Sequence, residues 1–297
     1  MTNRYKAITA GWKARLKALS RAWYRFSRNP LHVVGLVVLL LISLAAGLAP
    51  YITPYPEHAG PYTNFREAGL PPSKAHWFGT DRVGRDVFTR VIFGYRFSLL
   101  LGIVVLALST PPGVILGLIA GYYSGTWIET VIMRVTDIFL AVPPLVLALA
   151  VAAMLTPNLF NAMLAISISW WPWYSRLIYG MTLSLREQYF VRELELTGAS
   201  KPHILLREIL PNCLGPLLTK LTLDMGFAIL MGATLSFVGL GAQPPTPCLG
   251  TMVAEGAKRL PSEWWSTIFP ALAIVVVILA FNLVGDGLRD VFAEEEV

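Results

Sequence analysis

Long apolar runs alternate with shorter polar stretches over most of the chain, and the apolar runs are too long for the core of a water-soluble domain. A helix that crosses a bilayer needs about 20 mostly apolar residues. Six stretches meet this requirement, at residues 31–51, 97–121, 135–154, 162–183, 214–240 and 265–285. The pattern therefore predicts an all-α integral membrane protein with six transmembrane helices.

The composition agrees with this prediction. The 297 residues are 55% hydrophobic and only 14% charged, whereas soluble domains carry roughly a quarter charged residues. The mean hydropathy is +0.58. These values exclude a soluble enzyme, a nucleic-acid-binding protein and a small secreted protein held together by disulfides.

Basic residues are unevenly distributed, and their distribution predicts the orientation in the membrane. Eight of the 24 Lys and Arg lie between Arg4 and Arg28, and no acidic residue precedes Glu57. Cytoplasmic loops of membrane proteins are enriched in Lys and Arg. With the N-terminus inside, 14 basic residues fall in cytoplasmic segments and eight in outside segments, so we expect both termini in the cytoplasm. The net charge of +6 then reflects a membrane flank, and nucleic acid is not an expected partner.

The first apolar stretch has a second interpretation, a cleaved signal peptide, because a basic flank precedes it and small residues follow. However, a signal peptide has an apolar core of about 7–15 residues. This stretch has about 20 apolar residues after a basic flank of some thirty. We therefore expect a retained membrane anchor.

The spans divide the chain into five parts. We expect a basic cytoplasmic segment at residues 1–30, the first anchor at 31–52, and a proline-rich extracytoplasmic loop at 53–95. A transmembrane domain then covers residues 96–286, and its polar cytoplasmic loop spans residues 184–212. Residues 287–297 form a cytoplasmic tail.

Two features inside the predicted spans concern helix packing and buried charge. Glycines at every fourth residue let helix backbones approach closely in lipid, and we expect this packing role for Gly113, Gly117, Gly121 and Gly125. Asp224 is the one acidic residue well inside a span, near the first turns of residues 214–240. Proton-coupled carriers and pumps use such carboxylates, so both a polar cluster facing the bundle and a proton relay stay open for Asp224.

The chain offers little that would support catalysis or metal binding. Cys213 and Cys248 fall on opposite sides of the membrane in the expected topology, so we expect no disulfide. No metal-ligand spacing connects His32, His58, His76 and His203. The chain also lacks a G-x-x-x-x-G-K-[ST] phosphate loop and an acid/base arrangement. If transport is ATP-driven, the ATPase must therefore be a separate chain.

The loop at residues 184–212 predicts two helices with a sharp turn between them. Gly198 is free to take positive φ and ends the first helix, whereas Ser200 caps a second, short helix with Pro202 in its first turn. Pro211 is expected to end that short helix. Its apolar side consists of Ile204, Leu205, Ile209 and Leu210, and Leu206 adds to the surface for a partner. Without further information, a helix lying at the membrane surface is an equally good interpretation.

The outer loops carry a cluster of opposite charges. We expect Asp81 and Asp86 to pair with Arg82 and Arg85, and ion pairs of this kind contribute about 0–1 kcal/mol each when exposed. The loop at residues 243–265 adds aromatic and basic residues. Stabilisation of the loop by these pairs is one interpretation.

Several longer strings resemble one family of transporters. The spacing from Gly198 to Pro211, which ends in Ile-Leu-Pro, resembles the "EAA" loop of bacterial ABC-importer permeases. Four strings resemble the C-type permease subunit of dipeptide, oligopeptide and nickel importers: FGTDRVGRDVFTRVIFGYRFSL (78–99), MRVTDIFLAVPPLVLALAV (133–151), LSFVGLGAQPPTP (235–247) and FNLVGDGLRD (281–290).

The resemblance implies a type I ABC-importer permease fold in a bacterial inner membrane. A second, related permease subunit would complete the path, and two ATPase subunits would bind ATP and Mg, so this chain would hold no cofactor and catalyse no reaction. A solute-binding protein would deliver a di- or oligopeptide from outside. The same architecture importing nickel or another small solute is the alternative, and a secondary carrier or membrane enzyme is a more distant one.

The resemblance also implies roles for particular residues. Contact with the ATPase subunit is expected at Glu193, Gly198, Ala199, Ser200, Ile204, Leu205, Leu210 and Pro211. An outer gate, or a docking surface for the binding protein, is the second interpretation of Asp81, Arg82, Arg85 and Asp86. The chain departs from the family pattern at Arg192, where the EAA loop has Glu, at Gly232, where relatives have an acidic residue, and at Leu249, where relatives have Trp.

Overall fold

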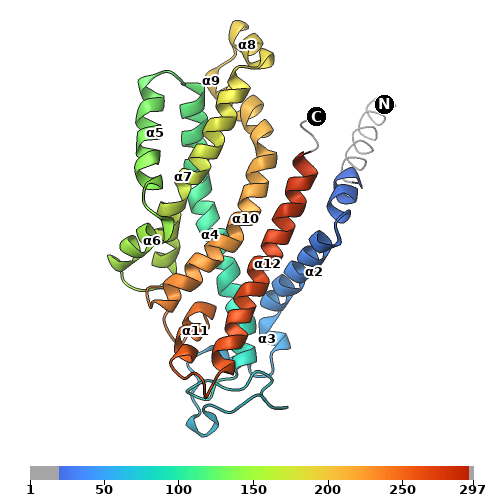
Figure 1. Cartoon of the computed structure of the whole chain (residues 1–297), viewed down its shortest axis with the longest axis vertical. Coiled ribbons are helices and arrows are strands. Elements are labelled where there is room, and N and C mark those ends of the chain that lie inside the picture. The colour runs from blue at the N-terminus through green and yellow to red at the C-terminus, as the bar shows by residue number, and fades with distance from the viewer. Residues whose placement is uncertain (1–19, 294–297) are drawn as a thin grey trace, which may run out of the picture.

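The structure is a computed structural model that describes residues 20–293. Long helices lie side by side and form an elongated bundle (Figure 1). Over the described residues there is no β-strand, apart from one isolated bridge between Thr80 and Asp86. The predicted all-α fold class is confirmed.

Four helices are long and apolar enough to cross a membrane. They are α2 (Pro30–Gly47), α4 (Val87–Tyr122), the continuous helix Lys201–Phe237 and α12 (Trp265–Ala293). A bent pair, α5 (Trp127–Leu140) with α6 (Pro144–Ala153), makes a fifth if both helices count as one span. Helix α7 (Leu159–Arg186) forms where a span was expected, but its Trp, Tyr, Ser and Arg residues keep it outside this set. Four or five helices are therefore candidate membrane spans, and the predicted number of six is not confirmed.

Helix α4 begins earlier than the pattern of apolar residues predicted. It starts at Val87 rather than near residue 97 because Asp86 caps it: the Asp86 carboxylate accepts a hydrogen bond from the Thr89 backbone N–H. The preceding segment contains only the short helices α3 (Ala49–Ile52), η1 (Pro56–Ala59) and η2 (Phe65–Glu67). The helix therefore carries Arg90, a charged residue that had been assigned to the loop, on its first turns.

The third predicted span is not one straight helix. Its two parts, α5 and α6, meet at an angle of 84°. Pro143 and Pro144 lie at the break, and a proline both lacks a backbone donor and clashes with the preceding turn. Two consecutive prolines therefore separate the segment into two helices.

The predicted end of the short helix at Pro211 is wrong. Helix α9 (Lys201–His203), the π-helical turn η3 (Ile204–Ile209) and α10 (Leu210–Phe237) follow without interruption. Pro211 lies in the first turn of α10, where a missing N–H is tolerated. The wider π turn directly before it lets the backbone pass the proline ring, so the chain continues as one helix.

The most extensive helix–helix contact in the bundle is between α4 and α7. A Cβ atom added at Gly113 would lie 2.5 Å from the Trp171 carbonyl oxygen, and one at Gly117 would lie 2.6 Å from the Ser175 carbonyl oxygen. Gly121 approaches Thr182 in the same way. The predicted packing role is confirmed for these three glycines. Gly125 instead follows the end of α4, with a φ of +80° and open space around it.

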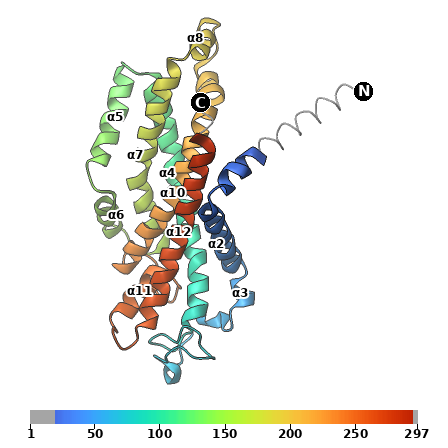
Figure 2. The same cartoon turned by 45° about the vertical axis from the view of Figure 1, so that its right-hand side comes forward.

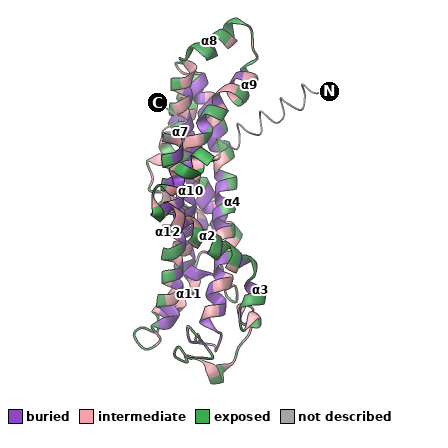
Figure 3. Ribbon diagram, turned by 90° about the vertical axis from the view of Figure 1, so that its right-hand side faces the viewer, coloured by how far each residue is buried: buried purple, intermediate pink, exposed green. Residues whose placement is uncertain are grey.

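The remaining elements fix the two ends of the bundle. Helix α8 (Tyr189–Leu196) stands at one end, and α11 (Leu249–Ala257) lies at the other, beside the segment that precedes α4 (Figure 1). We call these the α8 end and the α11 end. Helix α2 packs on α12, where a Cβ at Gly35 would lie 2.5 Å from the Leu283 Cβ. Buried residues form the interior of the bundle, and many residues on its outer faces are exposed (Figure 3).

Candidate functional site

The turn between α8 and α9 has the predicted geometry at its centre. Gly198 has a φ of +80°, which confirms that it ends α8 in a conformation that favours glycine. Ser200 occupies the N-cap position of α9 in extended backbone, but its side chain makes no capping hydrogen bond. Pro202 lies in the first turn, as expected.

Several residues expected to face a partner are turned toward the chain itself. Ile204 and Ile209 are completely buried, and Leu205 and Leu210 are half-buried against the core. Ile204 is therefore closed to a partner in this structure, Leu205 and Leu210 are accessible only in part, and the contact of Leu205 and Leu210 with a partner stays a prediction. Among the other predicted contact residues, Ala199 is half-buried and the exposed ones are Glu193, Gly198, Ser200 and Pro211.

Three apolar residues are exposed at this end: Leu206, which the sequence predicted for a partner surface, and Tyr189 and Leu196, which had not been singled out. Tyr189 is 84% exposed, Leu196 is 89% exposed and Leu206 is 56% exposed. We call these three residues the apolar patch. The amphipathic sequence of α8 could have predicted this exposure. Val191 is completely buried, and Leu196, five residues later, lies on another face of the helix.

Helix α8 is attached to the end of α4 by polar contacts. The Tyr122 hydroxyl donates a hydrogen bond of 2.7 Å to the Glu195 carboxylate. The Lys201 ammonium lies 5.0 Å from the centre of the Tyr123 ring. These contacts, and the continuous helix that leads from α9 into α10, connect the apolar patch with the long helices.

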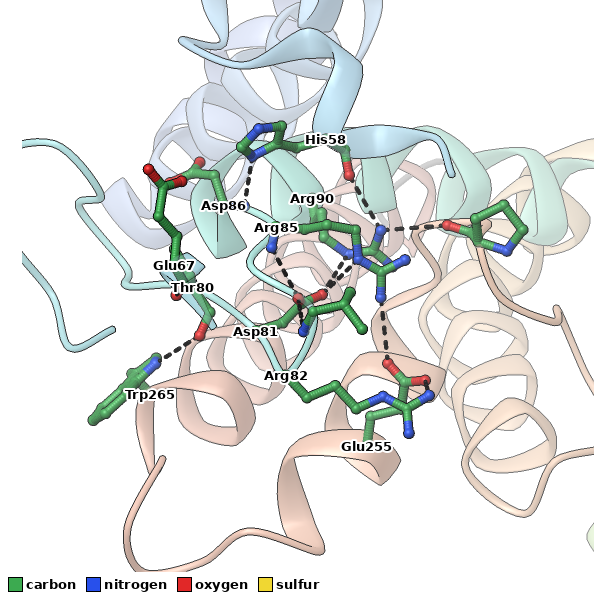
Figure 4. Close-up of polar contacts among 12 residues, drawn as sticks. His58, Glu67, Thr80, Asp81, Arg82, Arg85, Asp86, Arg90, Glu255 and Trp265 are labelled. Carbon is green, nitrogen blue, oxygen red and sulfur yellow. Dashed lines mark hydrogen bonds and ion pairs between the residues drawn. The ribbon is translucent and has the colours of Figure 1, made fainter. Parts of the chain in front are cut away.

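The α11 end contains the charge cluster that the sequence predicted (Figure 4). The Asp81 carboxylate accepts a hydrogen bond of 2.7 Å from the Arg85 Nε, and Arg90 Nε lies 3.6 Å from the same carboxylate. Backbone N–H groups of Val83 and Arg85 donate to the other Asp81 oxygen. Asp81 therefore organises the loop before α4.

Glu255 on α11 completes this cluster. Arg82 Nη2 lies 3.1 Å and Arg85 Nη2 lies 3.8 Å from its carboxylate oxygens. The pairs thus connect the loop before α4 to α11, at residues far apart in the sequence. Arg90 and Glu255 had not been singled out from the sequence, because only the fold brings α4 and α11 together.

The expected pairing of Asp86 with arginine is wrong. The Asp86 side chain is fully buried, caps α4 and accepts a hydrogen bond of 2.9 Å from His76 Nδ1. Of the four residues expected at an outer gate or docking surface, Arg85 and Asp86 are buried, Asp81 is largely covered and Arg82 is half-exposed. Arg82 is the one most available to a partner.

His58 connects the loop to the start of α4. Its Nδ1 accepts a hydrogen bond of 2.9 Å from the Asp86 backbone N–H, and its ring stacks on Tyr62 at a centroid distance of 4.0 Å. Burial lowers the pKa of His58 below 6.5, although the nearby carboxylates of Glu57 and Asp86 act in the opposite direction. A neutral imidazole is required here, because a protonated Nδ1 could not accept the Asp86 N–H.

Asp224 lies in the middle of α10, not in the first turns of a span as expected. It is 1% exposed, and its carboxylate accepts hydrogen bonds from Lys220 Nζ at 2.7 Å and from Trp170 Nε1 at 3.0 Å. The Lys220 ammonium also lies 5.8 Å from the centre of the Trp173 ring. The buried carboxylate is thus paired and joins α10 to α7. Across residues 20–293, no group of three or more His, Cys, Asp or Glu is placed to hold a metal ion.

Comparison with known proteins gives this geometry a context. Residues 113–295 match the family model for the inner membrane component of binding-protein-dependent transport systems, and residues 18–72 match the N-terminal transmembrane domain of oligopeptide transport permease C. A probable D,D-dipeptide transport system permease of Escherichia coli is 44% identical over 88% of this chain and 87% of its own length.

Two further relatives extend the comparison over most of the sequence. A dipeptide transport system permease of Alkalihalophilus pseudofirmus is 42% identical, covering 91% of this chain and 87% of its own length. A glutathione transport system permease of Pectobacterium atrosepticum is 39% identical, covering 97% and 92%. With the apolar helices described above, these matches establish a multi-pass protein of the inner membrane with a role in transport. The chain belongs to the family of inner membrane components, or permeases, of binding-protein-dependent transport systems.

Proposed function

We propose that this chain is one of two permease subunits of an ATP-driven importer for di- or oligopeptides. Its relatives carry names of dipeptide, D,D-dipeptide and glutathione transport permeases, which favours a peptide over nickel or another small solute. A second, related permease subunit would line the path together with this chain. Two ATPase subunits would bind ATP and Mg and hydrolyse the nucleotide.

The proposed topology has six spans with both termini in the cytoplasm. Helices α2, α4, α10 and α12 and the bent pair α5–α6 would be five of them, and α7 would be the sixth. A span with polar residues suits α7 because its close packing on α4 keeps many of these residues from lipid: Ser167, Ser169, Tyr174, Ser175 and Thr182 are all buried. The α8 end would then face the cytoplasm and the α11 end the outside.

The observation that carries the proposed mechanism is the apolar patch on an element that projects from the bundle. Apolar side chains gathered outside the predicted membrane spans favour an interaction site, and Tyr189, Leu196 and Leu206 stand together at the α8 end. We infer that this patch receives the ATPase subunit. Closure of the ATPase dimer would push α8 and the continuous α9–η3–α10 helix, and the bundle would open alternately to each side.

At the other end, the charge cluster joins the two outer loops and would move with them. Arg82 offers a half-exposed guanidinium to an incoming solute-binding protein, whereas Arg85 and Asp86 are held inside. The proposal therefore includes docking of the solute-binding protein at Arg82. Structural and docking roles can coexist here, because they fall on different residues.

The test is uptake of labelled Ala-Ala by proteoliposomes that contain this chain, its partner permease, the ATPase subunits and the binding protein. We expect uptake that requires ATP and is competed by unlabelled di- and tripeptides, and no uptake when this chain is omitted. Uptake of nickel with no competition by peptides would favour the alternative solute. Uptake that follows a proton gradient without ATP would contradict the importer proposal.

A further inference from the structure

A basic hollow lies beside the start of α2 and the end of α12, and the transport proposal does not use it. Its empty volume is about 1460 Å³, open mouth included, and it is lined by Arg21, Tyr24, Arg25, Arg28, Asn29, Pro30 and Asp290. Arg21 and Arg28 place two guanidinium groups beside the one carboxylate of Asp290, so positive charge is in excess here even with Arg25 engaged elsewhere. Because this volume includes an open mouth, the hollow suits a ligand that enters only in part.

The arginines are carried by a segment that is fixed to the bundle. Residues 20–27 are helical, and Phe26 is buried so close to α12 that a Cβ at Gly287 would lie 2.4 Å from its ring. His32 Nδ1 lies 3.3 Å from the Phe26 carbonyl oxygen. Arg25 Nη1 donates to the Val291 carbonyl at 3.2 Å. The hollow is therefore a built feature between two helices and not the surface of a loose tail.

The hollow also lies at the level where the first apolar span begins. The Asn29 side chain caps α2 by accepting from the Leu31 backbone N–H at 3.0 Å, so Arg28 stands directly at the edge of the span. Trp23 and Tyr24 are 55% and 73% exposed, and these two residue types are enriched at membrane–water interfaces. The segment 20–27 leaves the bundle at an angle to α2 (Figure 2), as a helix that lies in the interface would.

We propose that this hollow binds the phosphate headgroup of an anionic phospholipid. Guanidinium groups bind phosphate oxygens in bidentate fashion, and the open mouth leaves room for the acyl chains. These chains would lie along the exposed apolar side of α2, which includes Leu31 and Val34. The inference depends on α2 crossing the membrane and not on the transported solute.

The test measures lipid bound to the delipidated full-length chain by native mass spectrometry. Phosphatidylglycerol and phosphatidylcholine with identical acyl chains are the two probes. We expect the wild-type chain to bind phosphatidylglycerol at least tenfold more tightly, and this preference to weaken as ionic strength rises. In the double variant Arg21→Gln, Arg28→Gln the preference should disappear. The arginine that remains, Arg25, is already engaged with the Val291 carbonyl. Arg21→Lys, Arg28→Lys should restore part of it.

The matched control is Arg192→Gln, Arg207→Gln, which removes the same charge from exposed positions elsewhere at the α8 end. It should leave the preference unchanged, and an equal loss in both double variants would overturn the site. Glycerol phosphate at millimolar concentration should not displace the lipid; full displacement would identify a site for soluble anions instead. A preference for phosphatidylglycerol that emerges only after Glu294, Glu295 and Glu296 are changed to Gln would mean that these glutamates compete with the lipid for the arginines. That result would overturn the proposal.

Discussion

At the scale of single residues, the glycines of α4 determine how closely α7 can approach. Gly117 faces the α7 backbone, and an added Cβ would lie 2.6 Å from the Ser175 carbonyl oxygen. A backbone atom cannot move aside as a side chain can. We expect Gly117→Leu to destabilise the folded chain by about 1–3 kcal/mol or more, measured as a lower Tm in detergent.

Gly180 is the matched control for this prediction, because nothing lies within 4 Å of a Cβ added there. Gly180→Ala should leave the Tm unchanged or raise it slightly, since alanine favours a helix. Equal Tm values for Gly117→Leu and the wild type would mean that α4 and α7 are not in close contact.

His58 makes the outer loop sensitive to acid. Its pKa is lowered from 6.5 by burial, so at a pH below 6.5 the unfolded chain binds a proton that the folded chain resists. The unfolded state therefore gains stability as pH falls. We expect the Tm to decrease between pH 7.5 and 5.5, and His58→Asn to flatten this decrease because the amide oxygen still accepts the Asp86 N–H without titrating.

The control for the acid effect is His203, which is half-buried at the α8 end, far from the loop that holds His58. Its Nε2 lies 3.5 Å from the Glu208 carboxylate. His203→Asn should keep the wild-type slope of Tm against pH. A His58→Asn slope identical to the wild type would show that the neutral imidazole is not what couples the loop to α4.

Single residues also differ in how far the sequence could predict them. Gly198 was predictable because the string Gly-Ala-Ser-Lys-Pro signals the end of one helix and the start of another. Asp86 was not, since nothing local distinguishes a capping aspartate from one that pairs with a neighbouring arginine. Its role depends on His58 and His76, which reach it only in the folded loop.

At the scale of elements, the sequence predicted where apolar helices lie better than where they begin and end. The start of α4 was missed because Arg90 lies in its first turns, paired with Asp81 and shielded by the loop. The continuation through Pro211 was missed because the π turn η3 accommodates the proline. Both outcomes depend on contacts outside the local window, so residue periodicity alone could not supply them.

The turn between α8 and α9 should transmit force only if its geometry is held. Gly198→Val would force a β-branched residue to a φ of +80°, at a cost of order 1–2 kcal/mol. Nothing lies within 4 Å of a Cβ there, so the strain is confined to the backbone. We expect an inserted, folded chain with less peptide uptake per ATP hydrolysed in the reconstituted complex.

Gly198→Asn separates backbone geometry from side-chain size, because asparagine tolerates positive φ better than other residues. It should retain most of the coupling that the valine variant loses. Equal coupling in Gly198→Val and the wild type would mean that this turn does not transmit force.

At the scale of the whole molecule, the proposed topology places the two ends of the bundle on opposite sides of the membrane. Ser73 before α4 and Ser200 before α9 are both exposed. In a chain without Cys213 and Cys248, a cysteine at Ser73 should react with an impermeant maleimide in cells whose outer membrane is permeabilised. A cysteine at Ser200 should react only after the inner membrane is opened. Labelling of both from outside would contradict the six-span arrangement.

The family predicted from the sequence is confirmed, whereas of the six predicted spans the structure supports four or five. The sequence strings that resemble the family are spread over the chain, so an error in one helix boundary does not affect the family assignment. The span count depends on α7, whose polar residues are tolerated because α4 covers them. The apolar pattern predicted a span at residues 162–183, but the mean hydropathy of α7 counts its polar residues without regard to the helices that cover them, so α7 is not among the helices apolar enough to cross a membrane.

The account depends most on the claim that the apolar patch couples ATP hydrolysis to peptide uptake. The direct measurement is the ratio of peptide taken up to ATP hydrolysed by the reconstituted complex that carries Leu196→Asp and Leu206→Asp. Trp127→Asp is the control, because Trp127 is 74% exposed at the first residue of α5, where a helix tolerates an acidic residue. The account predicts a ratio at least tenfold below wild type for the patch variant and a wild-type ratio for the control. A wild-type ratio in the patch variant would contradict it.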